Sequence, residues 1–152
     1  MAQTNQAQTN PAPSAAEMAL TAADRLEIKA LLSEYSFHED SGNAEAWSAL
    51  FTEDGNFYGQ NKPSVHGRPA LLESARRRWN ERPEARGRVH WVCNILIWPT
   101  PEGAAAKSYQ MTVKEIDGTI EITALSGKED ELRKENGKWR FHVRRVVPLG
   151  AK

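Results

Sequence analysis

A stripe of apolar residues with helical spacing begins shortly after the first twenty residues. It is made up of Leu26, Ile28, Leu31, Leu32 and Tyr35. Thr21 and Asp24, just ahead of the stripe, are spaced like the two partners of a capping box. Ser41-Gly42-Asn43 supplies residues that end helices, so the pattern predicts an amphipathic helix from Ala22 to Glu39.

Two more helices are predicted before the chain turns to sheet. Residues 44–51 form a short amphipathic segment that ends before the turn residues Asp54-Gly55. Residues 67–81 start with Pro69 in the first helical turn, where the N–H that proline lacks would have no partner. Between these helices, residues 56–65 are a candidate pair of short strands.

The second half of the chain has the pattern of a sheet. Segments rich in β-branched and aromatic residues are separated by turn residues and cover 89–98, 105–116, 119–132 and 138–147. Asp117-Gly118 and Asn136-Gly137 are typical of two-residue hairpin turns, and Gly127 indicates an irregularity within its strand. Helices followed by hairpin-linked strands predict an α+β domain in which a curved sheet wraps over the helices. Such a sheet can enclose a pocket against the first helix.

The first twenty residues differ in composition from the rest. Residues 1–20 are mostly Ala, Gln, Thr, Asn, Pro and Ser with one charged residue, Glu17, and predict a flexible tail. They have neither a basic start nor a continuous apolar stretch, so they do not resemble a signal peptide. Residues 21–152 are then expected to form one domain, consistent with about 100–200 residues per domain.

Charge and cysteine content narrow the class of function. The 20 Lys and Arg residues balance 20 Asp and Glu residues, so we expect no nucleic-acid partner. No apolar run approaches the roughly 18 residues of a membrane helix, and we expect a cytoplasmic protein without a membrane partner. Cys93 is the only cysteine, and the four histidines lack metal-binding spacing, so neither a disulfide nor a metal site is predicted.

Polar residues interrupt the apolar strand predicted over residues 89–98. Strict alternation puts His90 and Asn94 on one face with Val92, while the other face is wholly apolar. Polar groups on a covered face need hydrogen-bond partners. This face is therefore predicted either to be partly wet or to line a polar spot in an apolar pocket.

The end of the first predicted helix supplies candidate partners for His90. A curved sheet that wraps this helix would bring Tyr35 and Asp40 towards His90. A carboxylate bonded to one ring nitrogen fixes the histidine tautomer and makes the other nitrogen a better base. Together the three side chains could abstract a proton beside a carbonyl and expel a leaving group without a cofactor.

Short motifs follow one another along the chain: Asp24-Arg-Leu-Glu-Ile28, Trp47, Leu50-Phe51, Asp54-Gly55, Gly67-Arg68, Arg88-Val-His90-Trp-Val-Cys-Asn94 and Asn136-Gly137-Lys-Trp139-Arg-Phe-His-Val-Arg144. Their order and spacing, from about Thr21 to Val147, resemble the SnoaL-like branch of the nuclear transport factor 2-like superfamily. The resemblance implies a cone-shaped α+β fold whose N-terminal helices pack in the concave face of a curved mixed, mostly antiparallel sheet. It also implies a homo-oligomer, either a trimer or a dimer.

In the dehydratase and dehydrochlorinase members of this superfamily, an Asp at the end of the first helix works with a His on a central strand, often helped by a Tyr. The resemblance places these roles on Asp40, His90 and Tyr35. Asn94, Trp91, Arg144 and Phe57 are further candidates for substrate binding. The expected function is a cofactor-independent, dehydratase-like lyase that acts on a cyclic hydrophobic substrate, such as an aromatic, polyketide or steroid-like compound.

Other interpretations stay open. The same pocket could serve an isomerase or cyclase, or the chain could be a non-catalytic assembly module like the small subunit of a dioxygenase. His90 could be a structural strand residue, Asp40 a solvated helix end and Tyr35 a core residue. The segment Gly127-Lys-Glu-Asp130 also departs from the Gly-x-Tyr-x-Asp pattern that the family often carries.

Overall fold

The computed structural model describes residues 19–83 and 86–149, so nearly all of the predicted N-terminal tail lies outside the described residues. The described elements are α1 (Ala22–Ser41), α2 (Ala44–Ala49), β1 (Phe51–Tyr58), β2 (Val65–His66), α3 (Arg68–Glu81), β3 (Arg88–Thr100), β4 (Gly103–Ile116), β5 (Thr119–Glu135) and β6 (Lys138–Val147). Three helices therefore precede most of the sheet, as the sequence pattern predicts. Among the described residues, no helix combines the length and hydropathy needed to cross a bilayer.

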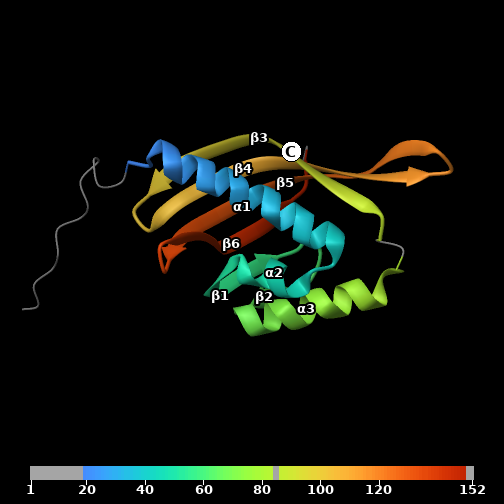
Figure 1. Cartoon of the computed structure of the whole chain (residues 1–152), viewed down its shortest axis with the longest axis horizontal. Helices are drawn as coiled ribbons and strands as arrows, with labels where there is room; N and C mark the ends of the chain where they lie inside the picture. Colours follow the sequence, from blue (N-terminus) through green and yellow to red (C-terminus); the bar gives the residue numbers. More distant parts are fainter. Residues whose placement is uncertain (1–18, 84–85, 150–152) are drawn as a thin grey trace, which may run out of the picture.

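The strands form one six-stranded sheet in the order β2-β1-β6-β5-β4-β3. The pair β1 and β6 is parallel, and the other neighbouring strands are antiparallel. Helix α1 crosses one face of the curved sheet, while α2 and α3 lie below it beside β1 (Figure 1). The predicted α+β fold, with helices in the concave face of a mixed, mostly antiparallel sheet, is confirmed.

Both ends of α1 are fixed by local contacts. Thr21 and Asp24 form the predicted capping box, in which each side chain accepts the backbone N–H of the other residue. At the other end Gly42 has φ +67, a backbone conformation that favours glycine. A Cβ there would also clash with the Trp79 ring, so both the backbone and the packing require glycine. Leu26 is wrongly placed in the apolar stripe, because its side chain is 68% exposed.

The hairpin turns are confirmed, but the end of the second helix and the place of the strand irregularity differ from the prediction. Asp117 and Asn136 both have positive φ, as does the glycine that follows each, which is the requirement of a two-residue turn between twisted strands. The second helix ends at Ala49, and Phe51 already belongs to β1. Gly127 pairs regularly with both neighbours; the breaks in register lie at Thr112/Val113 and at Glu131/Leu132 instead.

A bulge in β3 contradicts the strict alternation predicted for residues 89–98. Asn94 has φ +52, and the register with β4 shifts between Cys93 and Leu96. One extra residue in a strand moves every later side chain to the opposite face. His90 and Val92 therefore share the covered face with Ile95 and Ile97, and the prediction that Asn94 shares it is wrong.

The inward face of β4 changes character along its length. Ala104 and Ala106 are 1% exposed and belong to the core cluster that packs beneath α1. Further along the same face come Ser108, Gln110 and Thr112, which are also buried although they are polar. The small residues favour close packing of the helix over one half of the sheet, and the polar residues lie on the other half.

Candidate active site

An inner cavity of about 360 Å³ lies between α1 and the polar half of the sheet. Its lining includes Tyr35, Glu39, Phe57, Lys62, Arg78, His90, Gln110, Thr112, Ser126 and Lys128. A side pocket of about 180 Å³ shares His90 and Arg78 with this cavity and is also lined by Asp40. His90 therefore lies where the two spaces adjoin. The volume of the inner cavity is within the range of small-molecule sites.

One carboxylate holds both the ring and the backbone of His90. Oδ1 of Asp40 lies 2.5 Å from Nδ1 of His90, and Oδ2 accepts the backbone N–H of His90 at 3.0 Å. Both side chains are mostly buried, at 16% exposure for His90 and 19% for Asp40. A carboxylate at Nδ1 favours the tautomer with its proton there, which leaves Nε2 as the proton-accepting nitrogen.

The end of α1 brings Asp40 to this position. The helix continues past the predicted end at Glu39, to Ser41, so Asp40 lies within its last turn. There it reaches the first residues of β3, fifty positions further along the chain. The predicted meeting of Asp40 and His90 is thus present in the structure, while their chemical roles stay predictions.

Tyr35, which also lies on α1, lines the inner cavity. Its ring is 1% exposed and packs at 5.4 Å from Trp47 and 5.6 Å from Phe141. Burial raises the pKa of the Tyr35 hydroxyl above its usual value, so this group stays protonated and can donate a hydrogen bond. It shares the inner cavity with His90 but, among the described residues, is not a hydrogen-bond partner of His90 or Asp40.

The other predicted binding residues fall in different places. Phe57 lines the inner cavity and packs against Trp47 at 5.9 Å. Arg144 is fully buried behind Tyr35, with its guanidinium 4.0 Å from the ring centroid. Asn94 is exposed on the β3 bulge and is absent from the cavity lining.

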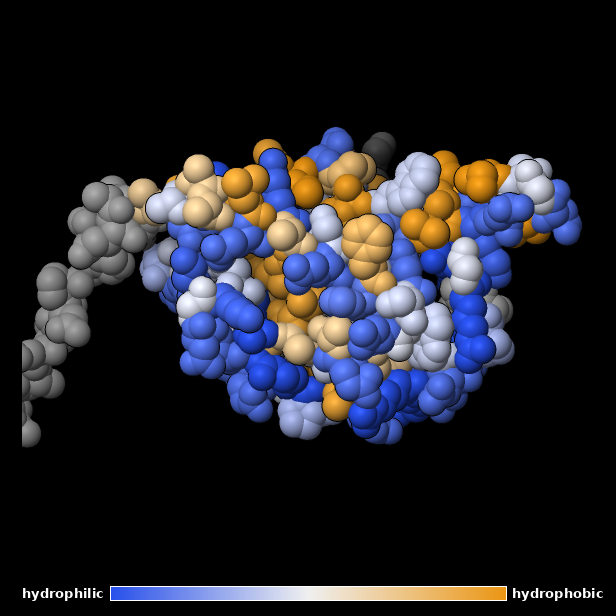
Figure 2. All heavy atoms as spheres, viewed as in Figure 1, coloured by the Kyte–Doolittle hydropathy of each residue, from blue (hydrophilic) through white to orange (hydrophobic). Residues whose placement is uncertain are grey.

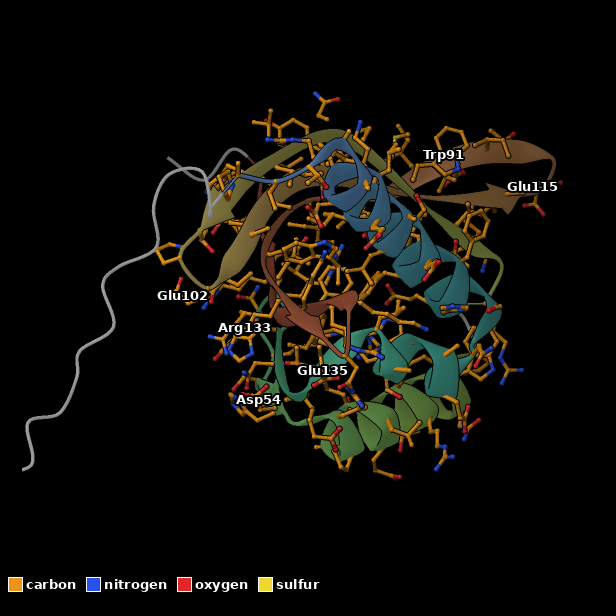
Figure 3. All side chains as sticks on the ribbon, turned by 60° about the vertical axis from the view of Figure 1, so that its left-hand side comes forward. Asp54, Trp91, Glu102, Glu115, Arg133 and Glu135 are labelled. Atoms are coloured by element: carbon orange, nitrogen blue, oxygen red, sulfur yellow. The ribbon has the colours of Figure 1, made fainter. Side chains whose placement is uncertain are left out.

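Trp91 lies outside the inner cavity. Its side chain is 53% exposed, on the face of β3 opposite to His90. Figure 3 shows it beside the β4–β5 hairpin, away from the space between α1 and the sheet. It borders an outer groove between α1 and β3, to which Phe37 also contributes. Trp91 is therefore absent from the lining of the inner cavity, although its groove also reaches Asp40 and His90.

A row of buried polar residues behind the cavity was not expected from the sequence. Asp130 on β5 stands directly opposite Arg144 on β6, and its Oδ2 accepts from Nη1 of Arg144 at 3.1 Å. Burial raises the pKa of Asp130 to about 6 even though Arg144 opposes this change. Lys128, two residues earlier on the same face, is 4% exposed. The charge of these residues is the feature that could have marked them in the structure as a functional or ion-pair site, because charged side chains are almost never buried without a partner.

Arg78 of α3 closes one side of both spaces. Its Nη1 lies 3.2 Å from Oε1 of Glu39, and its guanidinium stacks 4.9 Å from the Trp47 ring centroid. These contacts connect α3 to α1 and α2. Helical spacing alone could not single out Arg78, because Arg76 and Arg77 precede it and the three side chains point in different directions.

No group of three or more His, Cys, Asp or Glu side chains able to hold a metal ion occurs in residues 19–83 and 86–149. The ionisable side chains that line the side pocket with His90 are Asp40, Glu39 and His38 together with the cations Lys62, Arg78, Arg82 and Arg88. This set suits proton transfer and the binding of an electron-rich ligand.

Comparisons with known proteins agree with this fold. An NTF2-like protein with a cystatin-like fold from Novosphingobium aromaticivorans superposes with a TM-score of 0.76 at 25% identity, covering 86% of this chain and 84% of that one. A candidate scytalone dehydratase from the same organism has a TM-score of 0.66 at 20% identity, with 86% and 95% covered. A Catenulispora acidiphila protein in complex with S-DNPA has a TM-score of 0.73 at 20% identity, with 84% and 94% covered.

No curated protein sequence matches this chain. The sequence profile of the SnoaL-like domain, in contrast, matches residues 20–145. This match spans α1, the cavity lining except Val146, and all but the last residues of β6. The chain therefore belongs to the SnoaL-like domain family.

Proposed function

We propose that this chain is a cofactor-independent lyase that removes water from a cyclic, largely apolar substrate held in the inner cavity. The observation that carries the proposal is the contact between Asp40 and Nδ1 of His90 at the cavity wall. Membership of the SnoaL-like family and the likeness to a candidate scytalone dehydratase support it. In this arrangement Nε2 of His90 is the base, and Asp40 orients the ring and stabilises its charged form.

The proposed reaction moves one proton and one hydroxide. Nε2 of His90 takes a proton from the carbon beside a substrate carbonyl, and the C–H electron pair forms an enolate. The enolate then reforms the carbonyl, makes the new carbon–carbon double bond and expels hydroxide from the adjacent carbon. The hydroxide takes the proton from His90 and leaves as water, while the protonated Tyr35 hydroxyl polarises an oxygen of the substrate.

The walls of the cavity fit a ring system with few polar groups. Phe57, Val65 and Val146 give the lining apolar sides, while polar residues come from β4 and β5 and also from α1, α3 and the segment after β1. Pockets of this type bind a flat apolar body and fix its orientation by a few polar contacts. A cyclic compound with one or two oxygens matches this division.

Product mass distinguishes the proposed dehydration from the alternative isomerisation or cyclisation. Purified protein is incubated with a panel of cyclic β-hydroxy ketones, and the products are analysed by mass spectrometry. We expect a product lighter by one water. A product of unchanged mass would replace the lyase with an isomerase, and co-purification with a larger iron–sulfur subunit in place of any conversion would favour an assembly module.

We also propose that a second copy of the chain covers the outer face of the sheet. Apolar side chains from three adjacent strands meet there: Trp91, Cys93, Tyr109, Met111 and Leu125. Figure 2 shows hydrophobic residues gathered along the edge formed by β3 and the β4–β5 hairpin, while the side formed by α3 is hydrophilic. Exposed apolar patches of this kind are typical of association surfaces. A dimer or a trimer would bury them.

The Tyr109→Glu variant tests this association. Tyr109 is 49% exposed in the middle of the outer face, so a charge there should oppose burial against a second copy. We expect light scattering to give a dimer or trimer mass for the wild type and a monomer mass for the variant. Asn80→Asp, which adds a negative charge on the exposed surface of α3, should keep the wild-type mass. A monomeric wild type would contradict the proposal.

A further inference from the structure

Lys128 is a buried cation on the inner wall of the cavity. It is 4% exposed and pairs in the ladder with Ser108 of β4. Its Nζ donates to Oγ of Ser126 at 3.3 Å. The acid two residues along the strand, Asp130, is engaged by Arg144, and the ion pairs found among the described residues do not include Lys128. Its charge thus faces the cavity without a carboxylate partner.

Positive charge exceeds negative charge around the cavity. The lining includes the cations Lys62, Arg78 and Lys128 but only one carboxylate, Glu39. That carboxylate already contacts Arg78 at 3.2 Å. A buried charge without a counter-charge is costly, and an anionic ligand group would remove this cost.

The Lys128 ammonium keeps its proton at neutral pH in spite of these surroundings. Burial, followed by the charges of Arg144 and Arg78, lowers its pKa to about 8, while Glu39 and Asp130 oppose the change. Because this value lies above 7, most Lys128 side chains stay charged. They can therefore act as strong hydrogen-bond donors.

Gln110 provides an independent sign of a missing ligand. Its side chain lines the cavity, is 4% exposed and stands opposite Ser126 in the ladder. Among the residues that the structure describes, its Oε1 finds no hydrogen-bond partner. Buried polar atoms are nearly always satisfied, so an unsatisfied acceptor at a cavity wall indicates a hydrogen-bond donor, such as a hydroxyl group, that a bound molecule supplies.

We propose that Lys128 and Ser126 form an oxyanion-binding site that selects substrates with a carbonyl or phenolic oxygen, and that Oε1 of Gln110 accepts from a hydroxyl group of the same substrate. The inference rests on the proposed function, because the oxygen that gains charge is the one conjugated to the carbon that His90 deprotonates. As the C–H bond breaks and its proton moves to Nε2, the electron pair forms a carbon–carbon double bond and the carbonyl oxygen becomes negative. The Lys128 ammonium stabilises this oxygen, and no group outside the cavity is needed. The substrate class is therefore cyclic enolisable ketones and phenols.

Binding of a coloured phenol tests the site without turnover. 4-Nitrophenol is titrated with protein, and binding of its ionised form is followed by absorbance. Its affinity is compared with that of 4-nitroanisole, the methyl ether that cannot ionise. We expect the wild type to bind 4-nitrophenolate at least about 10-fold more tightly than 4-nitroanisole, as for a charge-assisted hydrogen bond. Lys128→Met should remove this preference and change the affinity for 4-nitroanisole less than about threefold.

Lys107→Met is the matched control. Lys107 is an exposed lysine on the opposite face of β4 and pairs with Glu129 at 2.8 Å, so its loss should leave the phenolate preference unchanged. Lys128→Gln provides a second variant if the methionine variant does not fold. Equal affinities for 4-nitrophenolate and 4-nitroanisole in the wild type overturn the proposal, and so does a Lys128 variant that keeps the preference.

Failure of this site and failure of the proposed reaction give different results. A protein that binds phenolate through Lys128 but dehydrates none of the hydroxy ketones retains the oxyanion site and loses the lyase assignment. A protein that dehydrates them with no phenolate preference retains the reaction and loses the oxyanion site. In both cases the binding measurement decides whether Lys128 binds the anionic oxygen.

Discussion

Turnover by the His90→Ala variant is expected to fall about 10²–10⁴-fold, as for removal of a general acid–base group. The main change should be in kcat with a smaller one in KM, because the base acts on the proton only as the bond breaks. The fold should survive, since the backbone N–H of His90 can still donate to Asp40. Steady-state kinetics of dehydration, together with circular dichroism, give the measurement.

The control for this experiment is another histidine with a carboxylate neighbour. Nδ1 of His142 on β6 lies 3.4 Å from Oδ1 of Asp54, and this pair is absent from the cavity lining. The His142→Ala variant should therefore keep wild-type turnover. A folded His90→Ala protein with full activity would refute the assignment of His90 as the base.

Asp40→Asn separates the role of the carboxylate from that of the ring. The amide can no longer accept strongly from Nδ1, so the preference for the tautomer with its proton on Nδ1 should be lost. Nitrogen-15 NMR of the His90 ring distinguishes the two tautomers. An identical ring spectrum in the wild type and the variant would mean that Asp40 does not orient His90.

The sequence pattern predicts this pair because both residues lie where regular periodicity still holds. Asp40 falls within the last turn of an amphipathic helix, and His90 comes before any irregularity in its strand. Beyond Cys93 the alternation rule fails, because the bulge at Asn94 inserts one residue. A bulge depends on the pairing of two strands, and the pattern of one strand does not reveal it.

The buried charges of β5 escaped prediction for a related reason. Lys128 and Asp130 alternate with Glu129 and Glu131, so both faces of this segment carry charges. Polarity then cannot tell which face is covered. The covered face is decided by the neighbouring strands, through the pairing of Asp130 with Ala106 on one side and Arg144 on the other.

The largest expected loss of stability follows from replacing Arg144 by Met. Its guanidinium is fully buried between Asp130 and the rings of Tyr35 and Phe141. Methionine fills most of the space but leaves the Asp130 carboxylate without a partner, which costs about 3–5 kcal/mol in comparable buried pairs. Urea unfolding near neutral pH should show a decrease of this size in the free energy of unfolding.

Arg145→Met is the matched control, since Arg145 is the next residue on β6 and pairs with Glu131 at 2.8 Å on the half-exposed side. Its loss should cost at most about 1 kcal/mol, as for an exposed ion pair. A comparable cost for the two variants would mean that the buried pair contributes no more than a surface one. The double variant Arg144→Met with Asp130→Asn should lose less stability than the sum of the single variants, because the two side chains interact directly.

The cost of Arg144→Met should also depend on pH in a defined direction. The folded state raises the pKa of Asp130 to about 6, so between this value and the ordinary one it holds a proton that the unfolded chain has lost. The contribution of this carboxyl to stability is therefore largest at low pH and is lost as the pH rises through about 6.

Arg144 lowers the pKa of Asp130 in the folded state. Without Arg144 this pKa rises, so the carboxyl keeps its stabilising proton up to a higher pH. Unfolding at about pH 5 should then show a smaller difference between Arg144→Met and the wild type than at about pH 8, because a protonated Asp130 no longer needs a cation. A difference that grows as the pH falls would contradict the assignment of the cost to the unpaired carboxylate.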